Sequence, residues 1–277
     1  MEYSLTEDAK NILKGAIGNP LLTNCFLYYK DVLEMINADT IRVLCFSDIV
    51  VLVHETDEIQ KMYYFLKNED AQITNIIRKV RMELSVYPNL EADFVARNLQ
   101  NQPDILRRLG FRFYKEYLRE TRVVSAKISD QELNVVELAK MEDLVAIYNL
   151  LYNTFDIMSD HLVSQNELRV LLETGQVFKV NIDEKLAGVL LSETQGKKSY
   201  LRAICVENEF IGCGVGASLM YNYIKRNIHK TKMFYLWVES TNQRARKLYE
   251  KLGYKEDGLR NYIYIFDSCL SKENTYL

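Results

Sequence analysis

The chain has 277 residues, of which 48% are hydrophobic and 26% charged, a length and composition that can supply two buried cores of ordinary size. A net charge of −3 argues against a broad nucleic-acid-binding surface. The five cysteines form no CxxC pair and no histidine-rich spacing accompanies them, so neither a zinc site nor a disulfide framework is expected.

Residues 1–15 are polar and acidic, without the apolar segment of a signal peptide. The longest apolar runs, such as 49–53, have the length of a strand and are too short to cross a membrane. These features predict a cytoplasmic protein with neither membrane nor nucleic acid as a partner.

The first half of the sequence is expected to alternate helices and strands. An apolar helix is expected within residues 21–36, and a hairpin follows from IRVLCF and DIVVLVHE. The further elements expected are a strand at 61–67, a helix at 71–80, a strand at 90–98, a short helix at 103–110 and a strand at 111–120.

The second half is expected to repeat this order. Apolar residues at helical spacing predict a helix at 141–154. After it we expect a helix at 164–173, strands at 177–181, 186–193 and 199–206, a helix at 214–226, a strand at 233–240, a helix within 242–254 and a strand at 261–266. The stretches 99–111 and 242–254 align without a gap, so the sequence predicts a repeat. The predicted domains are residues 1–125 and 134–277, joined by a polar linker at 126–133.

A glycine-rich turn lies between the strand at 199–206 and the next helix. Gly212, Gly214 and Gly216 let the backbone approach a ligand, and amides of the first helical turn favour an anion. Such glycines could also serve packing alone. Their spacing differs from the dinucleotide-binding GxGxxG and lacks the Lys-Ser/Thr of a P-loop, so a nicotinamide or ATP site is disfavoured.

Residues 134–266 resemble the GCN5-related N-acetyltransferase (GNAT) superfamily. The first motif that carries the resemblance runs from Ile211 to Gly216, after a strand that ends in Val206. The second consists of Asn242, Ala245, Leu248, Tyr249, Gly253 and Tyr254. Ile211 departs from the family, which usually has arginine or glutamine there, and this departure implies a lower affinity for CoA.

The resemblance implies an α/β fold of two tandem GNAT-like domains. Each is expected to have a mixed, mostly antiparallel sheet flanked by helices, with splayed central strands. The first domain is expected to be degenerate, because Leu99 and Leu106 stand where the second motif has Asn242 and Tyr249. Acidic residues, Glu69 and Asp70, replace its glycine turn and would repel a pyrophosphate.

The resemblance also implies the site residues, with acetyl-CoA as co-substrate and no metal. The residues expected to bind the cofactor are Ile204, Cys205 and Val206 for the pantetheine arm, Ile211, Gly212, Cys213, Gly214, Val215 and Gly216 for the pyrophosphate, and Asn242. Tyr249 is expected to protonate the leaving thiolate, although such an aromatic could also be a packing residue.

The general base and the acceptor site are less specified. Glu193, Glu207 and Glu239 are candidates for the base, and Glu239 is preferred. Asp156, Asp160 and His161, between the first two helices of the second domain, are candidates for holding the acceptor, although they could equally belong to a capped and solvated loop. Cys205 and Cys213 have no histidine near them in sequence and are interpreted as packing residues.

The sequence therefore predicts an acyl-CoA-dependent N-acyltransferase. It would move acetyl from acetyl-CoA to a small-molecule or peptide amine by direct attack. Two alternatives stay open: a CoA- or protein-binding module with little turnover, and a tandem transferase that uses another acyl carrier.

Overall fold

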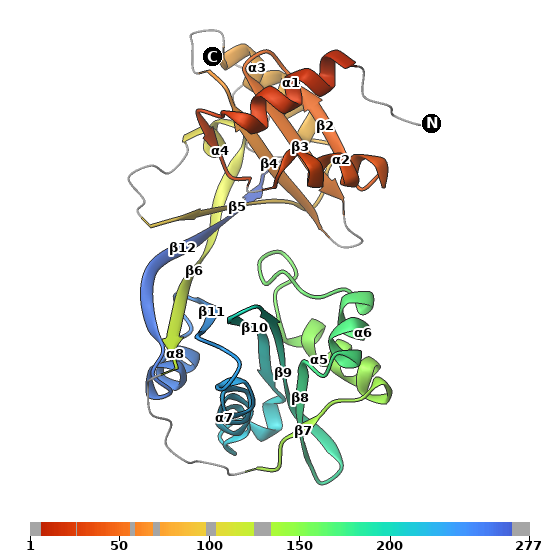
Figure 1. Cartoon of the computed structure of the whole chain (residues 1–277). Coiled ribbons are helices and arrows are strands. Elements are labelled where there is room, and N and C mark those ends of the chain that lie inside the picture. Colours follow the sequence, from red (N-terminus) through yellow and green to blue (C-terminus); the bar gives the residue numbers. More distant parts are fainter. Residues whose placement is uncertain are drawn as a thin grey trace. The chain divides into compact units, whose positions relative to one another are not determined.

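The structure is a computed structural model, and it describes residues 7–25, 27–55, 59–68, 73–97, 104–124 and 134–267. The chain divides into two compact units (Figure 1): unit 1 comprises Met1–Lys115 and Asn261–Leu277, and unit 2 comprises Glu116–Arg260. The predicted linker at 126–133 lies outside the described residues. The predicted second domain, 134–277, differs from unit 2 because the residues from Asn261 onward group with unit 1.

Unit 1 has strand order β2-β3-β4-β5, and β1 pairs with β4. Its elements are α1 (Glu7–Gly18), β1 (Leu22–Thr23), α2 (Tyr29–Asn37), β2 (Ile41–Cys45), β3 (Ile49–Glu55), β4 (Gln60–Leu66), α3 (Ile73–Leu84), β5 (Leu90–Ala96), α4 (Asp104–Arg108) and the first part of β6 (Phe111–Val123). The strands and α3 confirm the prediction. The helix expected within 21–36 is wrong in its first part, which is extended, and α1 was not predicted.

Helices cover both faces of the unit 1 sheet. Leu13 of α1 and Val32 of α2 pack with Val50 and Phe65 on one face. On the other face, α3 and α4 bury a second cluster, which includes Ile77, Val80, Leu84, Leu106, Val51 and Tyr64. Alternate residues of β3 therefore enter different cores, as strand geometry requires, and Figure 1 shows α1 and α3 over this sheet.

Unit 2 has strand order β6-β11-β10-β9-β8-β7. Its elements are the later part of β6, β7 (Glu137–Leu138), the 3₁₀ turn η2 (Met141–Asp143), α5 (Leu144–Thr154), α6 (Gln165–Glu173), β8 (Val177–Ile182), β9 (Lys185–Gln195), β10 (Lys198–Val206), η3 (Asn208–Phe210), α7 (Val215–Asn227), β11 (Met233–Glu239), α8 (Gln243–Lys251) and the first half of β12 (Lys255–Phe266). These elements confirm the predicted order. Neighbouring strands are mostly antiparallel, and β10–β11 is a parallel pair.

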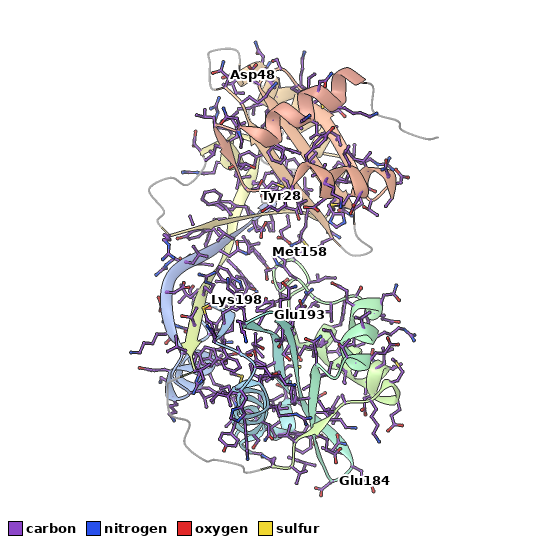
Figure 2. All side chains as sticks on the ribbon, viewed as in Figure 1. Tyr28, Asp48, Met158, Glu184, Glu193 and Lys198 are labelled. Atoms are coloured by element: carbon purple, nitrogen blue, oxygen red, sulfur yellow. The ribbon has the colours of Figure 1, made fainter. Side chains whose placement is uncertain are left out.

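Local sequence signals explain several boundaries in unit 2. Ser164 caps α6 by accepting from the Glu167 amide at 3.2 Å, while Glu167 accepts from the Ser164 amide at 2.8 Å. Asp183 and Glu184 have φ values of 48° and 62°, which close the tight β8–β9 hairpin; Figure 2 shows Glu184 at its tip.

The helices of unit 2 also lie on two faces of their sheet. α5 and α6 bury Ile147, Leu151 and Leu168 against β9. A separate cluster buries α7 and α8 against β10 and β11, with Leu219, Tyr223 and Tyr249 among its members. In the part of the chain that the structure describes, no helix has the length and apolar character needed to span a membrane.

Candidate functional site

The central strands of unit 2 separate part of the way along their length. β10 and β11 pair in parallel from Lys198↔Met233 to Leu201↔Leu236, but β10 continues to Val206 and β11 to Glu239. The register of β10 against β9 shifts between Leu201 and Ala203, at the same level. A bulge bends the strand that carries it, so β10 turns away from β11. The predicted splayed strands are confirmed.

The diverging part of β10 presents an open edge toward β11. Its other edge pairs with β9 through Cys205↔Val189, and the Glu207 amide donates to Ala187 O at 2.9 Å. Backbone groups alternate in direction along a strand, so those of Cys205 face β9 and those of Ile204 and Val206 face the opening. Ile204 and Val206 are therefore better placed than Cys205 to hydrogen bond a ligand between the strands.

Cys205 lacks the features of an activated nucleophile. Burial raises the pKa of the Cys205 thiol to about 12, so it is protonated at neutral pH. Cys205 belongs to the hydrophobic cluster formed by α5, α6 and β9, which agrees with its interpretation as a packing residue. Cys213 is exposed rather than packed.

The glycine turn requires glycine at two positions. Gly212 and Gly214 have φ values of 97° and 78°, a region that other residues rarely adopt, and Gly214 caps α7. The first hydrogen bond of the helix runs from the Ser218 amide to Gly214 O (3.0 Å), so the amides of residues 215–217 precede it. Asn134, which the sequence analysis missed, fastens the turn through its side-chain amide to Cys213 O (3.0 Å).

Gly188 on β9 sets the distance between the sheet and the glycine turn. A Cβ there would lie 2.7 Å from Val215 Cγ1 and 2.9 Å from Cys205 O. The start of α7 can therefore reach β9 and β10 only because position 188 has no side chain. From the sequence, Gly188 was predicted only as part of a strand, because its role depends on contacts distant in sequence.

We expect Gly188→Ala to lower the melting temperature of the protein. Relieving contacts this short requires Val215 and the backbone to shift, and overpacking of this kind costs about 1–3 kcal/mol. Thermal unfolding without ligand measures the effect. Gly15→Ala in α1 is the matched control, because a Cβ there meets nothing within 4 Å. Equal melting temperatures for Gly188→Ala and Gly15→Ala would contradict the packing argument.

The second sequence motif forms one capped helix that carries Tyr249. Asn242 Oδ1 accepts from the Ala245 amide at 3.1 Å, which makes Asn242 the N-cap of α8. Gly253 follows the helix with a φ of 82°. The structure thus gives Asn242 a capping role, whereas the sequence analysis expected it to contact the cofactor.

Tyr249 is buried among Leu236, Val238 and other members of the α7–α8 core, with its ring 5.9 Å from that of Tyr254. Burial raises its pKa, and the nearby Glu120 carboxylate adds to the rise. The Tyr249 hydroxyl is therefore protonated at neutral pH. Glu120 lies on β6 and is buried. The sequence pattern of this strand did not indicate that Glu120 is a neighbour of Tyr249.

The loop between α5 and α6 is fastened by the carboxylates that the sequence analysis assigned to the acceptor. Asp160 accepts from the Tyr117 hydroxyl at 2.7 Å and from the Asp156 amide at 2.7 Å. Asp156 accepts from the amide of Met158 at 2.9 Å, and Figure 2 labels Met158 in this loop. The third candidate, His161, has a left-handed backbone with φ 48°.

Tyr117 joins the predicted base to the predicted acceptor loop. It lies on β6 directly opposite Glu239 of β11, and its hydroxyl binds Asp160. The pKa of Tyr117 is raised by burial, by Asp160 and, more weakly, by Glu239. The structure therefore places Glu239 and Asp160, from distant parts of the sequence, beside one buried tyrosine. Tyr117 was missed because the sequence analysis assigned it to the first domain.

The three candidate bases all have partners. Glu193 pairs with Arg202 at 2.7 Å, and Figure 2 labels Glu193 on β9. Glu207 accepts from the Asn208 amide at 3.3 Å, and Glu239 accepts from the Thr241 hydroxyl at 2.6 Å. Of these, only Glu239 lies on the diverging strand β11 and beside Tyr117.

Unit 2 thus combines a sheet with diverging parallel strands, a glycine turn and a helix N-terminus. The family model described as "Acetyltransferase (GNAT) family" matches residues 142–254, and this part of the chain is a GNAT domain. No curated protein matches the sequence.

Solved structures resemble the chain over both units. A GCN5-related N-acetyltransferase from Sphaerobacter thermophilus has 11% identity and a TM-score of 0.60, covering 94% of this chain and 91% of its own. A tandem GNAT protein from the clavulanic acid biosynthesis pathway has 9% identity and a TM-score of 0.59, covering 95% of each chain. A GNAT-family acetyltransferase from Colwellia psychrerythraea has 14% identity and a TM-score of 0.53, covering 89% of this chain and 100% of its own. At these identities the likeness concerns the fold, which is that of tandem GNAT proteins.

Proposed function

We propose that unit 2 is an acyl-CoA-dependent N-acyltransferase that moves acetyl from acetyl-CoA to a primary amine by direct attack. The observation that carries the proposal is the open edge of β10, which leads into the glycine turn and the N-terminus of α7. An extended arm can pair with such an edge, while a phosphate group binds at the helix end.

The glycine turn suits a pyrophosphate in both shape and charge. Amides of residues 215–217 point out of the helix end, and the helix dipole adds positive potential there. A Cβ at Gly216 would make only ordinary contacts, 3.7 Å from side-chain atoms of Val206 and Leu248, so packing does not require glycine at this position. Along the arm, Ile204 and Val206 would supply the backbone hydrogen bonds, and one of their amides could stabilise negative charge on the thioester oxygen.

Tyr249 would donate a proton to the departing thiolate. Its raised pKa keeps the hydroxyl protonated at the pH of the reaction, and a buried donor loses no proton to bulk water. Burial in an apolar core also supports a packing role for the ring. Proton donation by the hydroxyl is therefore tested by a variant that retains the ring and lacks the hydroxyl.

The acceptor would bind beside Tyr117, where Glu239 and Asp160 lie close to one buried hydroxyl. Two carboxylates in a partly buried position favour a cationic ligand, so the acceptor class is an amine that is protonated in solution. Glu239 is the residue that we propose to remove its proton, directly or through water, before the attack.

We expect acetyl-CoA to raise the melting temperature. A ligand at 100 times its Kd adds about 2.7 kcal/mol of stability, which corresponds to roughly 5–10 °C in a unit of this size. A thermal-shift series with acetyl-CoA, free CoA, ATP and NAD makes the measurement, the last two serving as controls. An absence of any shift at millimolar acetyl-CoA would refute the cofactor assignment.

A binding module with little turnover is the second candidate, and Ile211 favours it. This side chain is 46% exposed at the glycine turn, where the family usually has a polar residue that helps to hold the pyrophosphate. Release of free CoA thiol with a panel of amines separates the candidates, because a binding module would show the thermal shift without thiol release.

A further inference from the structure

Unit 1 contains the same parting of two parallel strands as unit 2. β4 and β5 pair only at Gln60↔Leu90 and Lys61↔Glu91, although both strands run several residues further. The opposite edge of β4 is fully paired with β3, from Glu55↔Gln60 to Ile49↔Leu66. Any further partner of β4 must therefore lie on its β5 side, within the opening.

The segment Leu21–Cys25 lies in this opening. β1 pairs antiparallel with the end of β4, through Leu22↔Leu66 and Thr23↔Phe65. The Leu21 amide donates to Leu66 O at 2.8 Å, and the Thr23 hydroxyl donates to Tyr64 O at 2.5 Å. The segment is thus bound as a short added strand, in the manner of a peptide on a sheet edge.

Asn24 completes the arrangement by bridging the two separated strands. Its Nδ2 donates to Met62 O of β4 and to Asp93 O of β5, both at 3.0 Å, and its Oδ1 accepts from the Tyr64 amide at 2.8 Å. The side chain is buried, with 3% of the residue exposed. One side chain therefore replaces the strand-to-strand hydrogen bonds that the parting of β4 and β5 removes.

We infer that Leu21–Cys25 is an intramolecular occupant of the unit 1 groove, and that unit 1 takes no acyl-CoA. The comparison of the two grooves rests on the proposed function of unit 2. There, the backbone groups of Ile204 and Val206 face the opening between the strands. In unit 1 the equivalent groups on β4, including Met62 O and the Tyr64 amide, already bind the chain itself.

The occupant is held by its neighbours as well as by hydrogen bonds. Cys25 is 5% exposed and packs with Leu13 of α1 and Val32 of α2. Burial raises the pKa of its thiol to about 11. A ligand that entered this groove would have to displace a segment tied to both helices, so the occupant is a permanent part of unit 1.

Hydrogen exchange tests the occupant without any ligand. In the wild-type chain we expect the Leu21 and Tyr64 amides to exchange as slowly as those of β3. Asn24→Ala leaves Met62 O, Asp93 O and the Tyr64 amide without their partner, so we expect at least about tenfold faster exchange at Tyr64 and a melting temperature lower by about 10 °C. Asn75→Ala, an exposed position on α3, is the matched control and should change neither.

If Asn24→Ala fails to fold, Thr23→Val keeps the shape of the segment and removes the two hydrogen bonds of the Thr23 hydroxyl, to Tyr64 O and from the Cys25 amide. The wild-type exchange rates then still test the inference. Fast exchange at Tyr64 in the wild type would overturn the inference. The inference would also be overturned if Cys25 became alkylated only when acetyl-CoA is added, as located by peptide mass spectrometry.

The number of acetyl-CoA sites separates this inference from the proposed function. We expect equilibrium dialysis to find one site per chain in the wild type and none in Gly214→Asp. Two sites in the wild type, or one remaining in Gly214→Asp, would overturn the inference about unit 1. No site in the wild type would refute the function of unit 2, while the exchange of Tyr64 would continue to test the occupant.

Discussion

Replacing Gly214 by aspartate is expected to abolish the binding of acetyl-CoA. The position caps α7 with φ 78°, and the amides that we propose to hold the pyrophosphate follow it directly. A carboxylate there adds a like charge at the anion site. At about 4 Å and an effective dielectric constant of 20, that repulsion is roughly 4 kcal/mol, which raises Kd about 1,000-fold. Calorimetric titration with acetyl-CoA measures the loss.

Gly196→Asp controls for charge and for backbone strain. Gly196 also has a positive φ, 57°, and a Cβ there would meet nothing within 4 Å. We expect this variant to bind acetyl-CoA as the wild type does. The predicted acidic residues of the first domain, Glu69 and Asp70, lie outside the described residues; changing them to alanine should also leave Kd unchanged. If Gly214→Asp and the wild type bound acetyl-CoA with equal affinity, the glycine turn would not be part of the acetyl-CoA site.

The elements with strong local signals could be predicted from the sequence. α8 is an example, because Asn242 and Gly253 start and end it through contacts within the same helix. The glycine turn was likewise predictable, since Gly212 and Gly214 are needed for their own backbone conformation. Such signals act over a few residues, and they also carried the resemblance to the family.

The features that were not predicted depend on distant partners. Residues 21–36 are largely apolar and were expected to contain one helix, but Asn24 finds hydrogen-bond partners 38 to 69 residues away and holds residues 21–25 extended. Tyr117 and Asp160 meet across 43 residues, so neither the role of Tyr117 nor the anchoring of the α5–α6 loop could be read from local pattern. In the first case tertiary contacts override local preference.

The largest effect on turnover is expected from Tyr249→Phe. The change retains the ring, and hence most of the packing against Leu236 and Val238, and removes only the hydroxyl. Loss of one positioned proton donor typically costs on the order of 10²–10⁴ in rate. We therefore expect kcat to fall by about that factor while the Kd of acetyl-CoA stays within about twofold. Steady-state thiol release and a binding titration on the same preparations give both numbers.

Tyr254→Phe is the matched control for this variant. Tyr254 is buried in the same core, and the centroids of its ring and the Tyr249 ring lie 5.9 Å apart. Its hydroxyl makes no hydrogen bond within the described part of the chain. Removing that hydroxyl should leave kcat unchanged, because an unpaired buried hydroxyl contributes no favourable interaction. A similar loss of kcat in both variants would indicate a general effect of the core.

The pH dependence separates proton donation from packing. Burial raises the pKa of Tyr249, so the wild-type hydroxyl stays protonated from neutral pH up to at least its ordinary pKa, about 10. Across that range wild-type turnover should not fall through ionisation of Tyr249. Without the hydroxyl, the thiolate must take its proton from solvent, so the deficit of Tyr249→Phe should be smaller at low pH and grow as the pH rises. A deficit that is constant with pH, or a variant as active as the wild type, would make Tyr249 a packing residue and leave catalysis to backbone positioning on β10.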